Sequence, residues 1–215
     1  MSENKKVVVI GGGLAGSEAA WQLARRGIEV DLYEMRPVRQ TGAHHTDKLS
    51  ELVCSNSLGS YDEKSASALL KEEMKMLNSL IVDCAWRCKV PAGGALAVDR
   101  EMFSQMVTDE ISGNKLINLR RDEMPEIPED GVTIVATGPL TSESLAQSIQ
   151  KITGQSQLHF FDAAAPILTR DSINMDIAFE KSRYDKGDGA YINCPMDKEQ
   201  YDTFWNALIA AEKVQ

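Results

Sequence analysis

Three glycines near the N-terminus have the spacing of a turn that binds the pyrophosphate of a dinucleotide. They lie in the stretch Gly11-Gly12-Gly13-Leu14-Ala15-Gly16, which has the pattern GxGxxG. Gly11 would permit the turn, Gly13 would let the backbone approach the phosphates, and Gly16 would let helix and strand pack closely. The first N–H groups of the next helix would then bind the phosphates. The pattern predicts dinucleotide binding, and an ordinary βα turn is the alternative.

A carboxylate follows at the distance expected for a ribose contact. Glu34 lies 18 residues after Gly16, at the end of the apolar run 28–33. A carboxylate there accepts hydrogen bonds from a ribose 2′-hydroxyl and repels a 2′-phosphate, so the predicted ligand is FAD or NAD and not NADP. Arg36 and Arg39 follow, either reaching the adenosine or pyrophosphate or lying in a solvated loop.

A cysteine in a polar loop is the candidate nucleophile. Cys54 lies between Glu51 and the stretch 55–57. A thiolate suits nucleophilic catalysis, but its formation needs nearby positive charge that the sequence does not locate. A partly buried free thiol is the alternative. The other three cysteines are expected to pack or to shape a turn: Cys84, Cys88 and Cys194.

Two other polar groups have open roles. His44 and His45 have no third ligand at metal spacing, so no metal site is predicted, and solvent exposure or a cofactor contact is expected. A later group of cations and tyrosines could contact RNA or the acidic tail of a folate, or could support local turns. This group comprises Arg183, Tyr184, Lys186 and Tyr191.

The glycines and Glu34 need a strand, a helix and a second strand to position them. The apolar run 7–10 leads into the glycines, residues 17–24 have helical spacing, and residues 28–33 form the next strand. This βαβ order predicts an α/β protein with a Rossmann-like dinucleotide-binding domain.

Further elements follow from apolar periodicity and capping residues. Residues 63–80 are predicted as one amphipathic helix with Lys71 on its mostly solvated side. Its other side is predicted to carry Leu69, Leu70, Met74, Leu77 and Leu80. A buried strand is predicted over 132–136, running into Thr137-Gly138. The other predictions are helices over 99–111, 142–152 and 198–213 and a strand over 115–121.

Composition limits the partners and the compartment. The 215 residues carry a formal net charge of −9, which argues against nucleic-acid binding through bulk positive charge, so any RNA contact must be a local patch. No apolar run approaches the length of a membrane span, and the N-terminus lacks the features of a signal peptide. A cytoplasmic protein with reduced thiols and no membrane contact is expected.

Several stretches together resemble one enzyme family over essentially the whole chain. Among them are LVCSNSL at 52–58, VPAGGALAVDR at 90–100, ATGPLTS at 136–142 and DAAAPI at 162–167. The chain is similar to the bacterial folate- and FAD-dependent tRNA (uracil-5-)-methyltransferases. That family is about twice as long, so the resemblance implies that this chain is an N-terminal half.

The resemblance implies a two-dinucleotide-binding flavoprotein fold, with an FAD-binding domain over 1–155 and the start of a smaller α+β insertion domain over 156–215. It implies that 5,10-methylenetetrahydrofolate supplies a one-carbon unit to C5 of the T-loop uridine of tRNA, with electrons from NAD(P)H. Cys54 matches a catalytic cysteine, which would add to C6 of the uridine or act at the flavin. The residues assigned to the cofactor are Gly11, Gly12, Gly13, Leu14, Ala15, Gly16, Glu34, Arg36, Thr137 and Gly138.

Two other functions stay open. A related flavoprotein that installs carboxymethylaminomethyl groups on wobble uridines shares the glycine motif, but the stretches 162–166 and 193–196 favour the methyltransferase. A non-catalytic dinucleotide-binding or interaction module is the alternative from another class. A flavin disulfide reductase is disfavoured because Cys54 has no cysteine partner before Cys84. By itself, this half is expected to hold FAD weakly and to be inactive.

Overall fold

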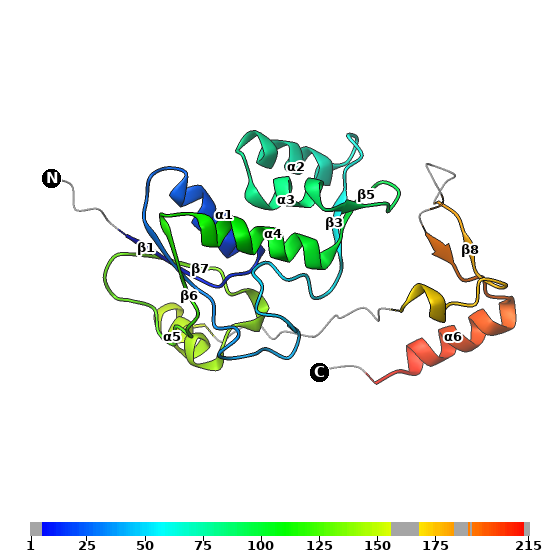
Figure 1. Cartoon of the computed structure of the whole chain (residues 1–215). Coiled ribbons are helices and arrows are strands. Elements are labelled where there is room, and N and C mark those ends of the chain that lie inside the picture. The colour runs from blue at the N-terminus through cyan, green and yellow to red at the C-terminus, as the bar shows by residue number, and fades with distance from the viewer. Residues whose placement is uncertain (1–5, 156–167, 183–188, 190, 213–215) are drawn as a thin grey trace. The chain divides into compact units, whose positions relative to one another are not determined.

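The structure, a computed structural model, describes residues 6–155, 168–182, 189 and 191–212. It divides into two compact units (Figure 1). Unit 1 is formed by Met1–Val90 and Ala95–Ala164, and unit 2 by Pro91–Gly94 and Ala165–Gln215. The boundary predicted between residues 155 and 156 stays a prediction.

A four-stranded parallel sheet forms the centre of unit 1. β1 (Val7–Ile10) lies between β2 (Val30–Tyr33) and β7 (Val132–Val135), and β6 (Ile117–Arg120) pairs with the far side of β2. Because the strands are parallel, their carboxyl ends meet at one edge of the sheet, where α/β folds bind ligands. The predicted α/β fold of Rossmann type is confirmed.

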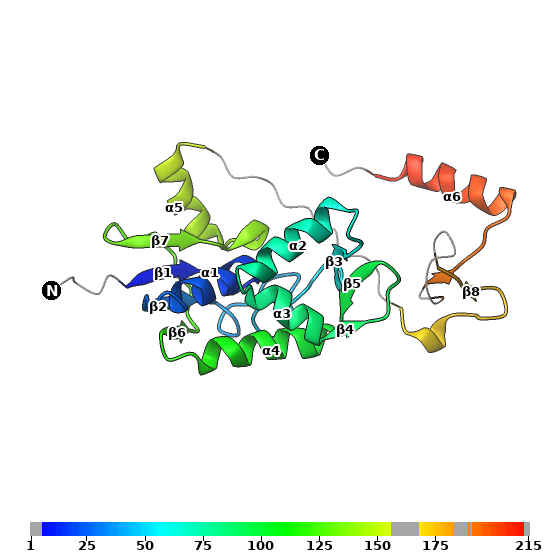
Figure 2. The ribbon, with the colours of Figure 1, turned by 90° about the horizontal axis from the view of Figure 1, so that it is seen from above.

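Helices lie on both sides of this sheet. α1 (Leu14–Ala24) and α4 (Arg100–Gly113) lie on one side, and α5 (Glu143–Thr153), which follows β7, lies on the other (Figures 1 and 2). α3 (Leu80–Arg87) packs against both α1 and α4. The core between sheet and helices includes the fully buried side chains Val9, Leu32, Leu96, Phe103 and Val107. Removing this apolar surface from water is the main force that holds the βαβ unit together.

The single helix predicted over 63–80 is wrong, because the structure has two helices there. α2 (Ala66–Met76) ends before Asn78, which adopts a left-handed φ of 57°. The N–H groups of Asn78 and Ser79 donate to carbonyls of the last turn of α2, which is the Schellman pattern of a helix end. Ser79 then caps α3, since its hydroxyl accepts the N–H of Val82.

The position predicted for Lys71, on the solvated side of an amphipathic helix, is also wrong. Leu69, Leu70 and Leu77 are 60%, 57% and 63% exposed, whereas Lys71 is buried. The Lys71 ammonium is held because it donates to the carbonyls of Ser60 and Ser67 at 2.9 and 3.0 Å and to the Ser67 hydroxyl at 2.6 Å. Those three acceptors compensate the loss of water around the charge.

The strand predicted over 132–136 forms, but it is not buried. β7 is an edge strand of the sheet, and Val132 and Val135 are 54% and 38% exposed. An unbroken apolar run is typical of a central parallel strand, so the run alone did not distinguish a centre from an edge.

Several predicted helices and their caps are confirmed. The Asp99 side chain accepts the N–H of Met102 at the start of α4. Ser142 caps α5, which ends at Gly154 in the left-handed conformation. The predicted strand over 115–121 appears as β6. A small antiparallel sheet completes unit 1, in the order β3 (Ser57–Ser60), β5 (Ala95–Val98) and β4 (Lys89–Val90).

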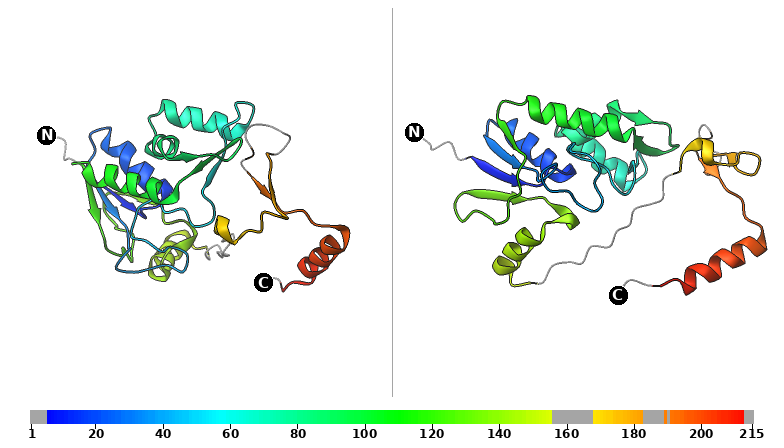
Figure 3. Two further views of the ribbon diagram at one scale, coloured as in Figure 1. Left: turned by 45° about the vertical axis from the view of Figure 1, so that its right-hand side comes forward. Right: turned by 60° about the horizontal axis from the view of Figure 1, so that its bottom comes forward.

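Unit 2 has few regular elements among its described residues. β8 (Phe179–Glu180) pairs with β9 (Ile192–Asn193), and the predicted C-terminal helix is α6 (Lys198–Ala210) (Figure 3). α6 begins with a capping box, in which Asp197 accepts the N–H of Gln200 and the Gln200 side chain accepts the N–H of Asp197. No residue of α6 is buried.

Candidate dinucleotide site

The glycine turn has the geometry that its sequence requires. Gly11 has a φ of +105°, and a Cβ there would lie 2.6 Å from the carbonyl oxygen of Ala136. A Cβ on Gly16 would overlap the carbonyl oxygen of Gly11, because α1 passes close to the turn. A Cβ on Gly13, in contrast, would have no atom within 4 Å. Two of the three motif glycines are therefore needed for packing, and Gly13 borders open space.

The start of α1 is suited to an anion. Gly13 is the N-cap of α1 and, as a glycine, has no side chain that could accept the first N–H groups of the helix. The first N–H groups of a helix have no partners inside the helix, and they lie at the positive end of its dipole. A pyrophosphate at this end would supply the missing acceptors.

A pocket of about 290 Å³ opens beside this turn. It is lined by the carboxyl ends of β1, β2 and β7, by the loop 41–54 and by residues 122–124 before β7. Nine of the ten residues assigned to the cofactor from sequence line it, together with Cys54. The exception is Gly16, which packs under the turn. Their roles in binding stay predictions, but the fold brings them to one place.

Glu34 lines this pocket and is itself buried. Its Oε2 accepts the N–H of Gly12 at 2.9 Å, and its Oε1 accepts Arg36 Nε, also at 2.9 Å. Burial raises the pKa of Glu34, but the hydrogen bonds and charge of Arg36 outweigh it and bring that pKa below its usual value. The carboxylate is therefore ionised and retains acceptor capacity for ribose hydroxyls.

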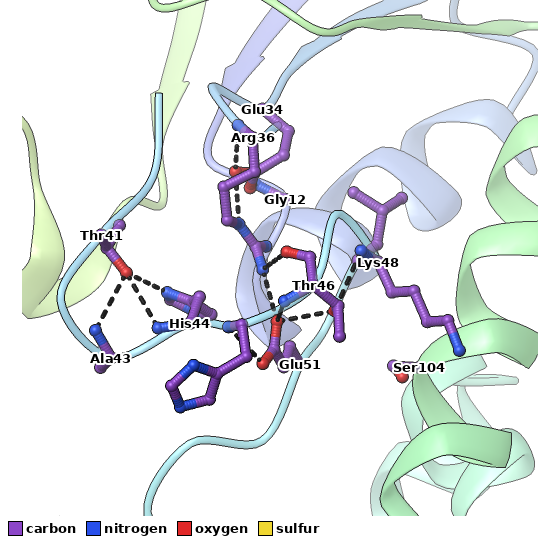
Figure 4. A network of polar contacts seen from close by, with 12 residues as sticks. Gly12, Glu34, Arg36, Thr41, Ala43, His44, Thr46, Lys48, Glu51 and Ser104 are labelled. Carbon is purple, nitrogen blue, oxygen red and sulfur yellow. Dashed lines mark hydrogen bonds and ion pairs between the residues drawn. The ribbon is translucent and has the colours of Figure 1, made fainter. Parts of the chain in front are cut away.

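The two arginines after Glu34 have different surroundings. Arg36 is only 1% exposed, although it borders the pocket, and its guanidinium lies between Glu34 and Glu51 (Figure 4). Arg39 is exposed and donates to both carboxylate oxygens of Glu123 at 2.6 Å, pointing to the connection before β7. The charges of both arginines are thus already compensated by carboxylates of the protein.

Glu51 also lines this pocket, although no sequence pattern predicts a role for it. Burial raises the pKa of Glu51, and hydrogen bonds from the backbone of His45 and from Thr46 lower it, with a net shift below the usual value. Nothing in the local sequence marks Glu51, because its partners lie on a separate turn and on Arg36.

Cys54 and His44 both border the pocket. Cys54 is exposed, and Arg36 and His44 are the basic residues that line the same pocket. His44 is partly buried, and burial together with the charge of Arg36 lowers its pKa, so its imidazole is neutral near pH 7. Nδ1 of His44 lies 2.7 Å from the Thr41 hydroxyl. The predicted contact of a histidine with the cofactor therefore stays open for His44, whereas His45 is not among the lining residues.

Cys84 and Cys88 agree with their predicted packing roles, whereas the turn role of Cys194 stays a prediction. Cys84 is fully buried in α3, and burial raises the pKa of its thiol to about 12. Cys88 is buried at the end of α3, and burial raises its pKa as well. Neither thiol is a nucleophile near pH 7. Cys194 is exposed in unit 2, just after β9.

The later polar group is only partly described. Arg183, Tyr184 and Lys186 lie outside the described residues, so their predicted contacts are not tested. The Tyr191 hydroxyl donates to the carbonyl of Ala92 at 2.9 Å, and its ring lies against Gly93. Within the described part of the chain, no three His, Cys, Asp or Glu side chains are grouped for a metal ion, and no helix could cross a membrane.

Taken together, the parallel sheet, the glycine turn at the start of α1 and the carboxylate at the end of β2 define a dinucleotide-binding protein of Rossmann type. The family model described as "Glucose inhibited division protein A" matches residues 6–215. The chain belongs to this family.

Curated relatives cover nearly all of the chain. Proteins named "Methylenetetrahydrofolate--tRNA-(uracil-5-)-methyltransferase TrmFO" are 60% identical over 211 residues in Lactobacillus helveticus, 60% over 215 in Lactobacillus acidophilus and 60% over 208 in Bacillus velezensis. These matches cover 98%, 100% and 97% of this chain, but 52%, 49% and 48% of the relatives. The chain therefore spans about half the length of these relatives.

The chain is also similar to solved structures. The "GidA-related protein" from Thermus thermophilus is 14% identical, with a TM-score of 0.35, over 64% of this chain and 54% of that protein.

Proposed function

We propose that this chain is the FAD-binding part of a folate-dependent tRNA (uracil-5-)-methyltransferase. The observation that carries the proposal is one pocket that joins a glycine turn, the Glu34 carboxylate and Cys54. The names of the relatives, which are 57–60% identical, support the same activity. The proposed acceptor is C5 of the T-loop uridine of tRNA, and the proposed compartment is the cytoplasm.

Each part of the site has a separate proposed role. The N-terminus of α1 would bind the pyrophosphate, and Glu34 would accept the ribose hydroxyls while repelling a 2′-phosphate. A bound flavin would supply the redox chemistry that links NAD(P)H to the one-carbon unit of 5,10-methylenetetrahydrofolate. The Cys54 thiolate would act as the nucleophile. With a net charge of −9, the chain would contact tRNA through a local basic patch.

The alternative enzyme, which modifies wobble uridines with carboxymethylaminomethyl groups, is not favoured. The relatives of 57–60% identity that match this chain are named as methyltransferases. A non-catalytic dinucleotide-binding module stays distinguishable by experiment, because it would bind the cofactor without supporting methyl transfer.

Two measurements test the proposal. The first is a titration of the purified chain with FAD, followed by the flavin absorption spectrum, with competition by ADP-ribose and by its 2′-phosphorylated form. We expect ADP-ribose to compete and the 2′-phosphate to compete much less. Equal competition would reject the assigned role of Glu34, and no flavin binding would reject the cofactor site.

The second measurement tests the activity in a protein of the relatives' length. This chain is fused to the half of the Lactobacillus acidophilus relative that lies beyond the matched region. The fusion is incubated with tRNA lacking 5-methyluridine, methylenetetrahydrofolate and NAD(P)H, and the nucleosides are analysed. Formation of 5-methyluridine is expected. If the fusion retains flavin but forms no 5-methyluridine, the non-catalytic module is the better description of this chain.

A further inference from the structure

A buried ion-pair bridge connects the predicted ribose site to the loop 41–54, which also lines the pocket. Arg36 Nε donates to Glu34 Oε1 at 2.9 Å, and Arg36 Nη1 donates to Glu51 Oε2 at 3.0 Å (Figure 4). Nη1 also lies 3.3 Å from the carbonyl oxygen of Thr46, to which it donates. One guanidinium thus joins the end of β2 to the loop that carries His44 and Cys54.

Glu51 organises the turn before it in the chain. Its Oε1 accepts the N–H of His45 at 2.9 Å, and its Oε2 accepts the N–H and hydroxyl of Thr46 at 3.1 and 2.8 Å. With the bond from Arg36, four donors converge on this carboxylate. Hydrogen bonds to an ionised acceptor are stronger than those between neutral groups. The turn that presents His44 is therefore closed by the charge of Glu51.

The same loop is anchored to the glycine turn. The N–H of Ser50 donates to the carbonyl of Gly12 at 2.9 Å, and the Leu49 side chain lies over the Gly12 α-carbon. Leu49 and Leu52 belong to the buried core of unit 1. These contacts hold residues 49–52, but they do not reach the turn 44–46. The bridge supplies that second attachment.

We propose that Glu51 is a positioning residue. Through its ion pair with Arg36, Glu51 holds the loop that carries His44 and Cys54 in place relative to Glu34, the proposed acceptor of the ribose hydroxyls. This inference rests on the proposed dinucleotide site for its consequence, namely that a bound cofactor and Cys54 face the same space. The anchoring of the loop itself does not depend on any ligand.

The charge balance explains why a neutral side chain would not replace Glu51. Arg36 is almost completely buried, and burying an ion is costly unless opposite charges compensate it. Glutamine at position 51 would remove one of the two carboxylates. It would also place an amide NH₂ among the donors of Arg36, His45 and Thr46, so at least one donor would lose its acceptor.

The first arm of the test needs no cofactor. Hydrogen exchange is compared in the parent and in Glu51→Gln, with Glu110→Gln as the matched control, because Glu110 makes an exposed ion pair with Arg87. We expect exchange of the His45 and Thr46 amides to become about tenfold faster in Glu51→Gln, since each loses a charged acceptor. Amides of β1 and α1 should be unchanged, and Glu51→Asp should restore part of the protection.

The second arm measures alkylation of Cys54 by iodoacetamide, with the exposed Cys194 as internal reference. In the parent, saturating FAD is expected to slow alkylation of Cys54 but not of Cys194 by at least about tenfold, because the ligand covers the pocket. In Glu51→Gln, the same saturation, verified by flavin absorbance, is expected to protect Cys54 less than about threefold.

The outcomes separate the inference from the proposed function. Unchanged amide exchange at residues 45 and 46 in Glu51→Gln overturns the inference, as does full protection of Cys54 in that variant. If the parent binds no flavin, the proposed function fails, and the exchange arm alone decides the anchoring. If the parent binds flavin without protecting Cys54, the dinucleotide site stands and the inference fails.

Discussion

At the scale of single residues, the chemical state of each group depends on its surroundings in the folded protein. The Glu34 carboxylate is ionised because Arg36 and the N–H of Gly12 compensate its burial. Cys84 has the same chemical group as Cys54, but it is buried in α3 and its pKa is raised to about 12. Residue type alone therefore does not select the candidate nucleophile, and the two cysteines differ in their exposure to the pocket.

The predicted role of Glu34 can be tested by selectivity. In Glu34→Gln the charge that repels a 2′-phosphate is absent, so the preference for ADP-ribose over its 2′-phosphorylated form should fall by about tenfold or more. The ratio of the two dissociation constants is measured by calorimetry. Because a loss of stability affects both ligands alike, an unchanged ratio would contradict the assignment. Glu72→Gln, on the exposed side of α2, is the control.

The role of Cys54 can be tested against a buried cysteine. The test uses the fusion of this chain to the second half of its relative. In this fusion, Cys54→Ser should nearly abolish 5-methyluridine formation and should not change the amount of bound flavin, because a hydroxyl is a much weaker nucleophile than a thiolate near neutral pH. Cys84→Ser should retain turnover and lower the free energy of unfolding by about 1–3 kcal/mol, because it buries a hydroxyl. Near-parent turnover of Cys54→Ser would remove this residue from the mechanism.

At the scale of elements, the site depends on where strands end and helices begin. Gly12 is enclosed, since a Cβ there would lie 2.5 Å from Leu49 Cδ2 and 2.8 Å from Glu34 Oε2. Gly13, one residue further, faces open space at the N-terminus of α1. Neighbouring glycines of one motif thus have different physical roles, one in packing and one in leaving room for a ligand.

Alanine at these two glycines should separate stability from binding. Gly12→Ala should lower the free energy of unfolding by about 1–3 kcal/mol through overpacking. Gly13→Ala should change it by less than about 1 kcal/mol, since the φ of −75° suits alanine, but should weaken ADP binding. Urea denaturation and ADP titration of both variants provide the check. Equal loss of stability in the two variants would show that the open space at Gly13 is not present in solution.

The buried Lys71 permits a second test at this scale. Lys71→Met should lower the free energy of unfolding by about 1–3 kcal/mol, because three carbonyl and hydroxyl acceptors would lose their donor. Lys75→Met is the matched control, since the Lys75 side chain is 63% exposed and makes only a surface ion pair with Glu72. Denaturant midpoints of the two variants that agree within error would contradict the burial of Lys71.

At the scale of the whole molecule, stability should depend on pH through three carboxylates that line the pocket. The pKa values of Glu34 and Glu51 lie below their usual range, and Arg39 together with Ser144 lowers the pKa of Glu123 to about 2. A carboxyl group whose pKa is lower in the folded than in the unfolded state stabilises the fold above its unfolded pKa. That contribution is lost as the pH falls through the folded pKa.

The contribution of these three carboxylates to the free energy of unfolding should therefore be nearly constant above about pH 5 and fall steadily toward pH 2. Urea denaturation at a series of pH values measures it. Glu123→Gln should reduce the slope in the lowest part of this range, because Glu123 has a pKa of about 2 in the folded protein. A slope that is identical in the parent and in this variant would show that the Arg39–Glu123 pair does not form in solution.

The sequence by itself determined the local features of the site. The glycine spacing, the apolar runs 7–10 and 28–33 and the capping residues of α4 and α5 specify turns, strands and helix ends through contacts within a few residues. Dinucleotide binding could be predicted for that reason. The resemblance to a methyltransferase family likewise depended on stretches that can be read without a structure.

Only the tertiary structure decided which side chains are buried and which share a pocket. The apolar run of β7 gives no sign that it forms a sheet edge, and the leucines of α2 give no sign that Lys71 is the side chain that packs inward. The Glu34–Arg36–Glu51 bridge spans residues whose pairing depends on how the loop 41–54 returns to the glycine turn. Burial and ion pairing depend on the whole surroundings of a side chain, which local sequence does not contain.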